Sequence, residues 1–173
     1  MTSSINTETG ERADLLESLN RHRSFLRFTV RDLTDEQAAE RPTRSELCLG
    51  GLLKHVAATE QGWVNFMMDG AAALGSADDA DLGDRAREFS MLEGETLTGL
   101  LEAYDQVAAR TDELVATLPD LDISHPLPAA PWFEPGARWS ARRVLLHIIA
   151  ETAQHAGHAD ILRESLDGAK TMG

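Results

Sequence analysis

Apolar residues recur at helical spacing along almost the whole chain, and this pattern limits the fold more than any other feature. No stretch alternates apolar and polar residues at period two for long enough to build a central sheet. The sequence therefore predicts an all-α protein, a four-helix bundle with mixed connections between its long helices. The four predicted long helices are Glu11–Leu33, Leu47–Met68, Glu95–Leu118 and a last helix from Ser140 to about Asp167.

The segments between the long helices carry turn and breaker signals. Thr34 is suited to cap a short helix at Asp35–Glu40, which Pro42 would stop. The stretch Ala71–Gly94 is rich in aspartate and glycine, which is typical of a solvated connector. Asp120–Arg138 holds four prolines, so we expect a long, extended crossover before the last helix, with room for a short strand pair.

Length and charge narrow the class of protein. The 173 residues suit a single domain, residues 1–173, with residues 1–8 as a polar, disordered tail. The formal net charge of −13 argues against nucleic-acid binding and against an anionic membrane surface. No apolar run reaches the roughly 18 residues of a membrane span, and no signal peptide is visible. Because a single cysteine, Cys48, cannot form an internal disulfide, we expect a cytoplasmic protein.

The last predicted helix carries a stripe of ionisable side chains, His147, Glu151, His155 and His158. At about 100° per residue, all four fall within an arc of roughly 80°. Because the surrounding residues are mostly apolar, we expect the stripe to face away from solvent, where unsatisfied polar groups cost several kcal/mol. A metal ion would satisfy them, and Glu151 and His155 have the i, i+4 spacing at which two side chains chelate one ion.

A third metal ligand must come from another helix, and His55 is the best candidate. It lies in the middle of the second long helix, on an apolar face that also carries Leu52 and Trp63. Considered alone, His55 would be a hydrogen-bonded histidine of the core. Together with Glu151 and His155, it completes a set of two histidines and one carboxylate that suits a divalent transition metal.

The remaining histidines have open roles. His147 lies one turn from Glu151 and could hydrogen-bond it, as groups that orient metal ligands do. His158 could be a fourth ligand, an acid or base, or part of a pocket wall. His22 and His125 fall in charged or loop sequence and are assigned no role.

Two blocks of sequence, one in the second long helix and one in the last, resemble a known family. Arg23, the LTDEQ stretch at 33–37 and Arg41–Pro42 fit the same family. The first block is LGGLLKHVA at 49–57, followed by Glu60 and Trp63; the second runs from Trp139 through His147, Glu151, His155 and His158 to Asp160. On these residues, nearly the whole chain resembles the DinB-like superfamily, and within it the DUF664-type branch.

This resemblance implies a DinB-like four-helix bundle, dimeric in many relatives, that holds a divalent metal ion. The family's ligand positions correspond to His55 in the second long helix and to Glu151 and His155 in the last. With a glutamate at position 151, the chain resembles the mycothiol-dependent maleylpyruvate isomerase branch of the superfamily. The N-terminal domain of those proteins combines such a metal site with a low-molecular-weight thiol. The resemblance thus implies a homodimer with mycothiol as co-substrate.

The leading hypothesis from the sequence is a metal-dependent enzyme similar to a thiol S-transferase, which joins a small thiol to an electrophile. Zinc is the first choice of metal, and nickel or iron also suits two nitrogens and one carboxylate. The alternative is a non-catalytic metal-binding or interaction bundle, with a stress-related or other role. A third hypothesis is a plain bundle in which the histidines are hydrogen-bonded core residues.

Overall fold

The computed structural model describes residues 10–74 and 86–171 of the chain. Most of these residues are helical, which confirms the predicted all-α class, and a small two-stranded sheet is added. The predicted tail and residues 75–85 of the acidic connector lie outside the described residues. No described helix is both long enough and apolar enough to cross a membrane. In chain order the described elements are α1 (Glu11–Thr29), α2 (Asp35–Ala39), α3 (Leu49–Asp69), the 3-10 helix η1 (Gly70–Leu74), α5 (Leu97–Thr117), β1 (Ser124–Pro126), β2 (Arg138–Ser140) and α6 (Ala141–Asp167).

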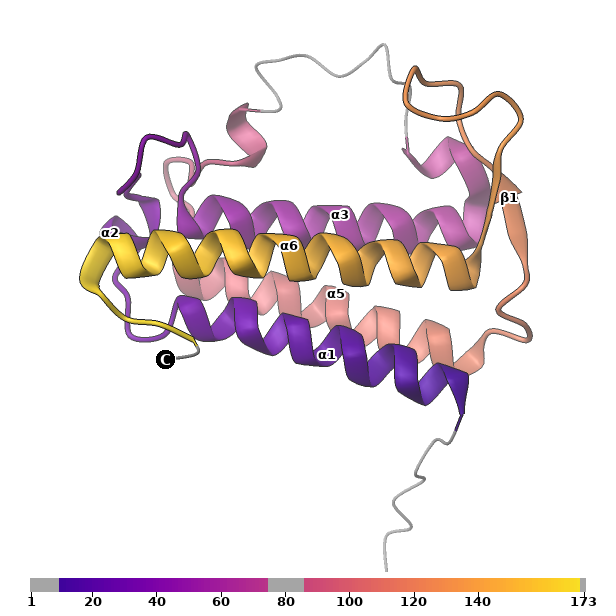
Figure 1. The fold of residues 1–173 in the computed structure, drawn as a ribbon, viewed down its shortest axis with the longest axis horizontal. Helices are drawn as coiled ribbons and strands as arrows, with labels where there is room; N and C mark the ends of the chain where they lie inside the picture. Colours follow the sequence, from indigo (N-terminus) through magenta and orange to yellow (C-terminus); the bar gives the residue numbers. More distant parts are fainter. Residues whose placement is uncertain (1–9, 75–85, 172–173) are drawn as a thin grey trace, which may run out of the picture.

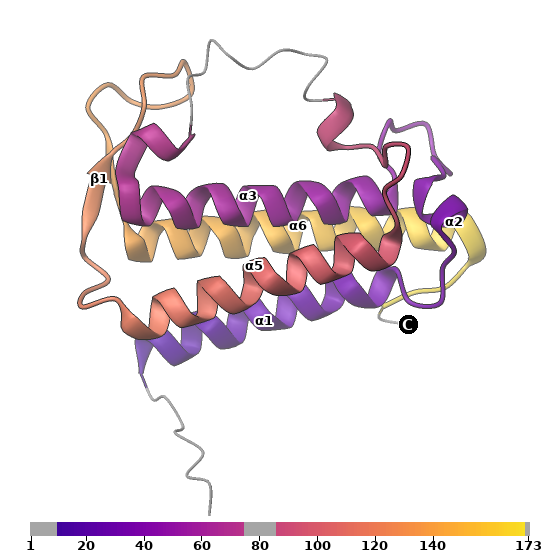
Figure 2. The same cartoon turned by 180° about the vertical axis from the view of Figure 1, so that it is seen from behind.

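The four long helices lie side by side in two pairs (Figures 1 and 2). Helices α3 and α6 form one pair and α1 and α5 the other, and the pairs pack together because α1 contacts α6 and α3 contacts α5. The loop between β1 and β2 and the helical turn at residues 86–88 lie on the side of the α3–α6 pair that faces away from α1 and α5. On this side, loop residues can therefore cover side chains of α3 and α6.

Side-chain caps explain where the helices begin. Thr34 accepts a hydrogen bond from the Gln37 backbone N–H, and the Gln37 side chain accepts one from the Thr34 backbone, which confirms the predicted cap of α2. Cys48, Thr96 and Ser140 cap α3, α5 and α6 in the same way, each accepting from the N–H three residues further along. These caps place the starts of α3 and α5 two residues later than the apolar pattern predicted.

The end of α1 differs from the prediction. The helix ends at Thr29 rather than Leu33, because Asp32 adopts a left-handed φ of 58° that a right-handed helix does not contain. Arg163 of α6 donates to the carbonyls of Thr29 and Arg31 at 2.6 and 2.8 Å, which satisfies groups that the helix end leaves free. Leu33 still packs against the core, so the apolar pattern continues past the end of the helix.

Two apolar clusters fill the interior, and a polar layer separates them. On α1, Leu26 belongs to one cluster and Leu19 to the other, and Arg23 lies between them. Arg23 is fully buried and pairs with Glu60 of α3, which is fully buried as well. The interior of the molecule is thus apolar at both ends of the helices and ionic in the middle.

The crossover before α6 contains the short strand pair that the sequence allowed for. β1 and β2 pair antiparallel, with Ser124 opposite Ser140 and His125 opposite Trp139. The backbone N–H of Ala141 then donates to the carbonyl of Ile123 at 2.9 Å. This pairing fixes the start of α6 and places Trp139 directly before the helix.

Candidate metal centre

The structure brings the three predicted ligands together between α3 and α6. His55 of α3 and Glu151 and His155 of α6 each offer one ligand atom, and these atoms all lie within 4.8 Å of one another. The Nε2 atom of His155 is 3.6 Å from Glu151 Oε2, and the rings of His55 and His155 meet edge to face at 4.8 Å between centroids. Bonds of about 2.0–2.1 Å to a tetrahedral zinc ion place donor atoms roughly 3.4 Å apart. The three donors therefore fit one divalent ion with small side-chain movements.

The charges of this cluster also suit a cation. Within the described part of the chain, the basic groups nearest the Glu151 carboxylate are His155 Nε2 at 3.6 Å and His147 Nε2 at 3.9 Å, both beyond hydrogen-bond distance. Burial, together with the neighbouring His55, lowers the pKa of His155 to about 4. The imidazole of His155 is therefore neutral at pH 7 and keeps the lone pair that a metal ion requires.

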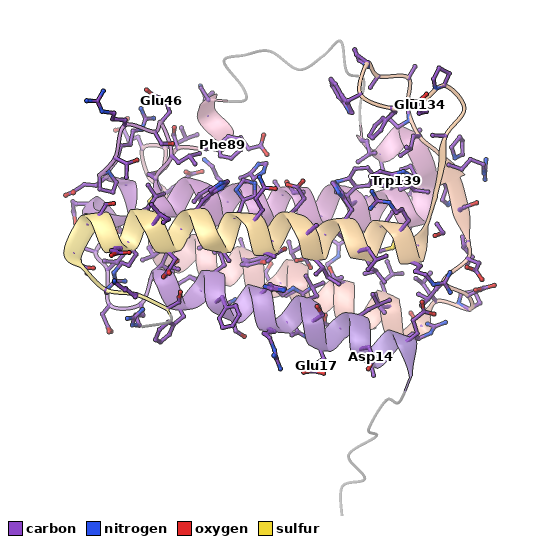
Figure 3. The ribbon with its side chains drawn as sticks, viewed as in Figure 1. Asp14, Glu17, Glu46, Phe89, Glu134 and Trp139 are labelled. Atoms are coloured by element: carbon purple, nitrogen blue, oxygen red, sulfur yellow. The ribbon has the colours of Figure 1, made fainter. Side chains whose placement is uncertain are left out.

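A segment within the stretch that we predicted to be a solvated connector contacts His55. Glu88 Oε1 lies 2.7 Å from His55 Nδ1, and the Phe89 ring stacks on the imidazole at 4.1 Å between centroids. Figure 3 shows Phe89 on the side of the α3–α6 pair that carries the loops. With Nδ1 engaged by Glu88, Nε2 is the nitrogen of His55 that remains for the cluster, and its long contact with the Thr59 hydroxyl at 3.4 Å is one that a metal ion could replace.

An aromatic wall adjoins the cluster on the Glu151 side; it consists of Trp63, Phe133, Trp139 and His147. Trp63 and Trp139 stack at 4.7 Å, and the His147 ring meets both edge to face at 4.8 and 5.0 Å. Phe133 meets Trp139 edge to face at 5.7 Å, and the Arg143 guanidinium lies 4.2 Å above the Trp139 ring. Trp139 is labelled in Figure 3, on the same side of the helices as Phe89. The wall therefore offers an apolar surface with one cationic edge next to the donors.

His147 and His158 lie at the edge of the cluster and not among its donors. His147 is too far from Glu151 for the predicted hydrogen bond, and burial lowers its pKa. His158 is exposed, and its Nδ1 lies 3.4 Å from Nδ1 of His155, the nitrogen opposite the one that faces Glu151. Thus His147 belongs to the aromatic wall, and His158 lies behind His155.

The ionisable stripe of α6 is less buried than the sequence predicted. The Glu151 side chain is 31% exposed, and two of the apolar residues around the stripe, Leu146 and Ile161, are 48% and 62% exposed. The physical reason is that α6 packs mainly against α1 and α3, which leaves its outer face open. The site is therefore half-buried and accessible to small molecules.

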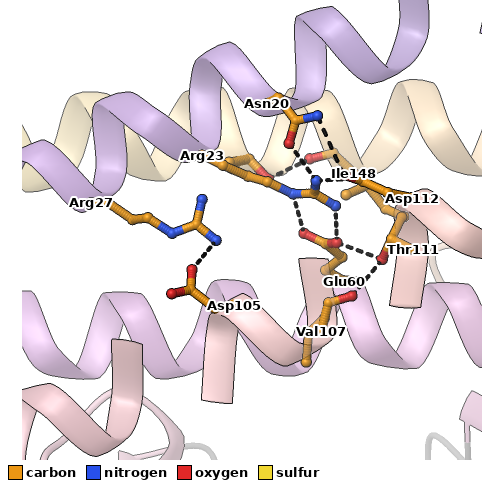
Figure 4. A network of polar contacts seen from close by, with 10 residues as sticks. Asn20, Arg23, Arg27, Glu60, Asp105, Val107, Thr111, Asp112 and Ile148 are labelled. Carbon is orange, nitrogen blue, oxygen red and sulfur yellow. Dashed lines mark hydrogen bonds and ion pairs between the residues drawn. The ribbon is translucent and has the colours of Figure 1, made fainter. Parts of the chain in front are cut away.

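Sequence reasoning missed the ionic layer in the core. Figure 4 shows Arg23 donating to both carboxylate oxygens of Glu60, through Nε at 3.1 Å and through one terminal nitrogen. Thr111 donates to Glu60 at 2.6 Å, and Asp112 accepts from Arg23 at 2.8 Å. The sequence analysis named Arg23 and Glu60 only among the residues that carry the family resemblance. Nothing in their local sequence indicated that they pair across 37 positions.

Sequence reasoning also missed Glu88 and Phe89, because they belong to a stretch that we interpreted as a solvated connector. A signal was present in the adjacent glycines Gly50 and Gly51 within an apolar helix, since such glycines mark close approach of another segment. Cys48 has a structural role at the start of α3, where its sulfur accepts a hydrogen bond from the Gly51 N–H at 3.3 Å.

Fold and cluster together define a helical protein with two histidines and one carboxylate gathered on one accessible face. The chain belongs to the mycothiol S-transferase family, whose model matches residues 14–168. This is a DinB-like family, so the resemblance noted in the sequence is confirmed. Among solved structures the chain is similar to a conserved protein from Enterococcus faecalis, with a TM-score of 0.69 over 94% of this chain and 100% of that one. Their identity is 14%, so the likeness concerns the fold alone. A search of curated proteins gave no match.

Proposed function

We propose that this protein is a metal-dependent thiol S-transferase that joins mycothiol, a low-molecular-weight thiol, to an electrophile. The observation that carries the proposal is the convergence of donor atoms from His55, Glu151 and His155 within 4.8 Å. Family membership supports mycothiol as the thiol. The proposal includes a single DinB-like four-helix bundle as the scaffold, whereas the homodimer and the cytoplasmic location stay predictions.

His55, Glu151 and His155 would hold the metal, and their chemistry limits its identity. Two imidazole nitrogens and one carboxylate suit zinc first, and nickel or iron as well. A bound divalent metal would lower the pKa of a coordinated thiol, so that the thiolate is present at neutral pH. Glu151 would offset part of the positive charge, and the neutral His155 would donate without first losing a proton.

The reacting thiol would come from outside the chain. Cys48 is the single cysteine, its side chain is buried, and its sulfur is engaged at the start of α3. In the transfer, the thiol loses its proton and its sulfur forms a carbon–sulfur bond to the electrophile. The leaving group takes the electron pair of the bond that breaks. The aromatic wall is the surface on which the electrophile would lie, because His147 connects it to Glu151.

The test combines metal analysis with a conjugation assay. Wild-type protein loaded with zinc is incubated with a model electrophile and mycothiol, and in parallel with bacillithiol, and conjugate formation is measured. His155→Ala removes one ligand and should reduce conjugation to the background rate. His22→Ala is the matched control, because His22 lies on α1 and contacts Phe25 rather than the cluster.

Each outcome decides between the hypotheses. Conjugation by wild type and His22→Ala, but not by His155→Ala, supports the transferase. Zinc binding by the wild type with only background turnover of both thiols refutes the transferase and leaves the non-catalytic metal-binding alternative. Less than about a tenth of an equivalent of metal after reloading refutes both and favours hydrogen-bonded histidines without a metal.

A further inference from the structure

The segment that contacts His55 is fixed to α3 by a backbone approach that only glycine permits. A Cβ atom on Gly51 would lie 1.9 Å from the Phe89 carbonyl oxygen, and one on Gly50 would lie 2.2 Å from the Met91 sulfur. Because real Cβ atoms do not approach other atoms this closely, any larger residue at position 51 would displace the backbone of the segment, whereas one at position 50 would displace the flexible Met91 side chain. Gly51 therefore sets the height at which Glu88 and Phe89 lie above α3.

Polar contacts hold the same segment at Phe89 and at residues that follow it. The Cys48 sulfur lies 3.6 Å from the Phe89 carbonyl oxygen, and Arg41 donates to the Ser90 hydroxyl at 3.0 Å. Further along, Lys54 of α3 pairs with Glu95 at 2.9 Å. The segment is thus held in place by contacts other than the one with His55. Its backbone position places the Glu88 carboxylate next to the imidazole.

The contact between Glu88 and His55 has the geometry of a carboxylate that orients a metal ligand. Glu88 engages Nδ1 at 2.7 Å, which leaves Nε2 facing the cluster, and the stacked Phe89 ring restricts rotation of the imidazole. A histidine held in this way has a fixed tautomer and a more basic donor nitrogen, and loss of such a partner typically weakens metal binding by about 10–100-fold.

We propose that Glu88 is a positioning residue of the metal centre, which holds His55 with Nε2 aimed at the ion. The inference rests on the proposed function, because it requires that His55 binds a metal. Glu88 does not contact the ion or the substrate in this account. It acts through His55 by engaging Nδ1, whereas Thr59 of α3 lies 3.4 Å from Nε2 and does not engage Nδ1.

The experiment measures zinc affinity by competition with a chromophoric chelator, for wild type, Glu88→Gln and Glu88→Ala. Glu93→Gln and Glu93→Ala are the matched controls, since Glu93 is an exposed glutamate of the same segment. The melting temperature of each metal-free protein is recorded as well. We expect affinity to fall about 10-fold in Glu88→Gln and up to about 100-fold in Glu88→Ala, with Glu93 variants unchanged. Metal-free melting temperatures should agree among all five proteins.

Three results would overturn the inference, and they are distinguishable. Zinc affinities of both Glu88 variants within twofold of the Glu93 variants would overturn it while the proposed function stands. A fall in affinity that tracks a lower metal-free melting temperature would make Glu88 a structural residue instead. Failure of the wild type to bind zinc would overturn the proposed function and this inference together.

Discussion

Helix α3 carries two charged clusters about 140° apart around its axis, and they differ in how their carboxylates are satisfied. Glu60 is fully buried and accepts hydrogen bonds from Arg23 and Thr111. Glu151, which α6 brings next to His55, is 31% exposed and has no described donor within hydrogen-bond distance. The protein itself satisfies the first carboxylate, whereas we propose that a metal cation satisfies Glu151 together with His55 and His155.

Replacing the buried carboxylate should separate the two clusters most strongly. Glu60→Gln leaves Arg23 buried with part of its charge unpaired, so we expect the free energy of unfolding to fall by about 3 kcal/mol. The matched change Glu151→Gln in metal-free protein should cost less than about 1 kcal/mol, because that side chain is partly exposed and has no hydrogen-bond donor among the described residues. Urea titrations of the three proteins provide the measurement. Equal losses of unfolding free energy in Glu60→Gln and Glu151→Gln would contradict the proposed difference between the two clusters.

Zinc should stabilise the protein through the second cluster only. At a free zinc concentration of 100 times Kd, we expect the unfolding free energy to rise by about 2.7 kcal/mol in the wild type. Glu60→Gln should gain the same increment from its lower starting point, because its ligands are intact, and His155→Ala should gain none. A zinc effect that persists in His155→Ala would place the binding site elsewhere.

Gly51→Ala tests how the segment above His55 depends on close packing. The added methyl group would meet the Phe89 carbonyl, so we expect a loss of about 1–3 kcal/mol in stability together with weaker zinc binding. Gly157→Ala on α6 is the control, because a Cβ there meets nothing within 4 Å, and it should stabilise the helix by up to about 1 kcal/mol. Unfolding and zinc competition are measured on both. Unchanged zinc affinity in Gly51→Ala would show that the position of this segment does not influence zinc binding.

The smallest expected effect is the contribution of Glu95 to the pH dependence of the unfolding free energy. Burial of Glu95 would raise its pKa, but hydrogen bonds from Lys54 and from the Leu92 backbone outweigh it, and the pKa is lowered. Because the folded-state pKa lies below the unfolded one, the stabilisation is complete above about pH 4.5 and is lost as the pH falls through the folded-state value. Glu95→Gln should therefore unfold with a flatter pH dependence below pH 4.5, a difference of at most about 1 kcal/mol. Parallel pH slopes in wild type and variant would disprove this contribution.

The parts of the molecule that sequence could predict are those set by local geometry. Helical spacing and caps such as Thr34 located the helices to within a few residues. The i, i+4 spacing of Glu151 and His155 placed both on one face of α6, because that relation depends only on the helix repeat.

The parts that sequence could not predict depend on contacts between distant segments. Glu60 pairs with Arg23 across 37 positions, and Glu88 reaches His55 across 33. Neither contact leaves a periodic pattern, and a single sequence contains no second observation from which to infer it. The exposure of Leu146 was missed for the same reason, since it depends on which helices pack against α6.

The most direct test of the central claim is anomalous diffraction at the zinc edge from crystals of zinc-loaded protein. The account predicts one strong peak within bonding distance of His155 Nε2, a Glu151 carboxylate oxygen and a His55 nitrogen. A peak coordinated by His155 and His158 without His55, or no peak between α3 and α6, would contradict it.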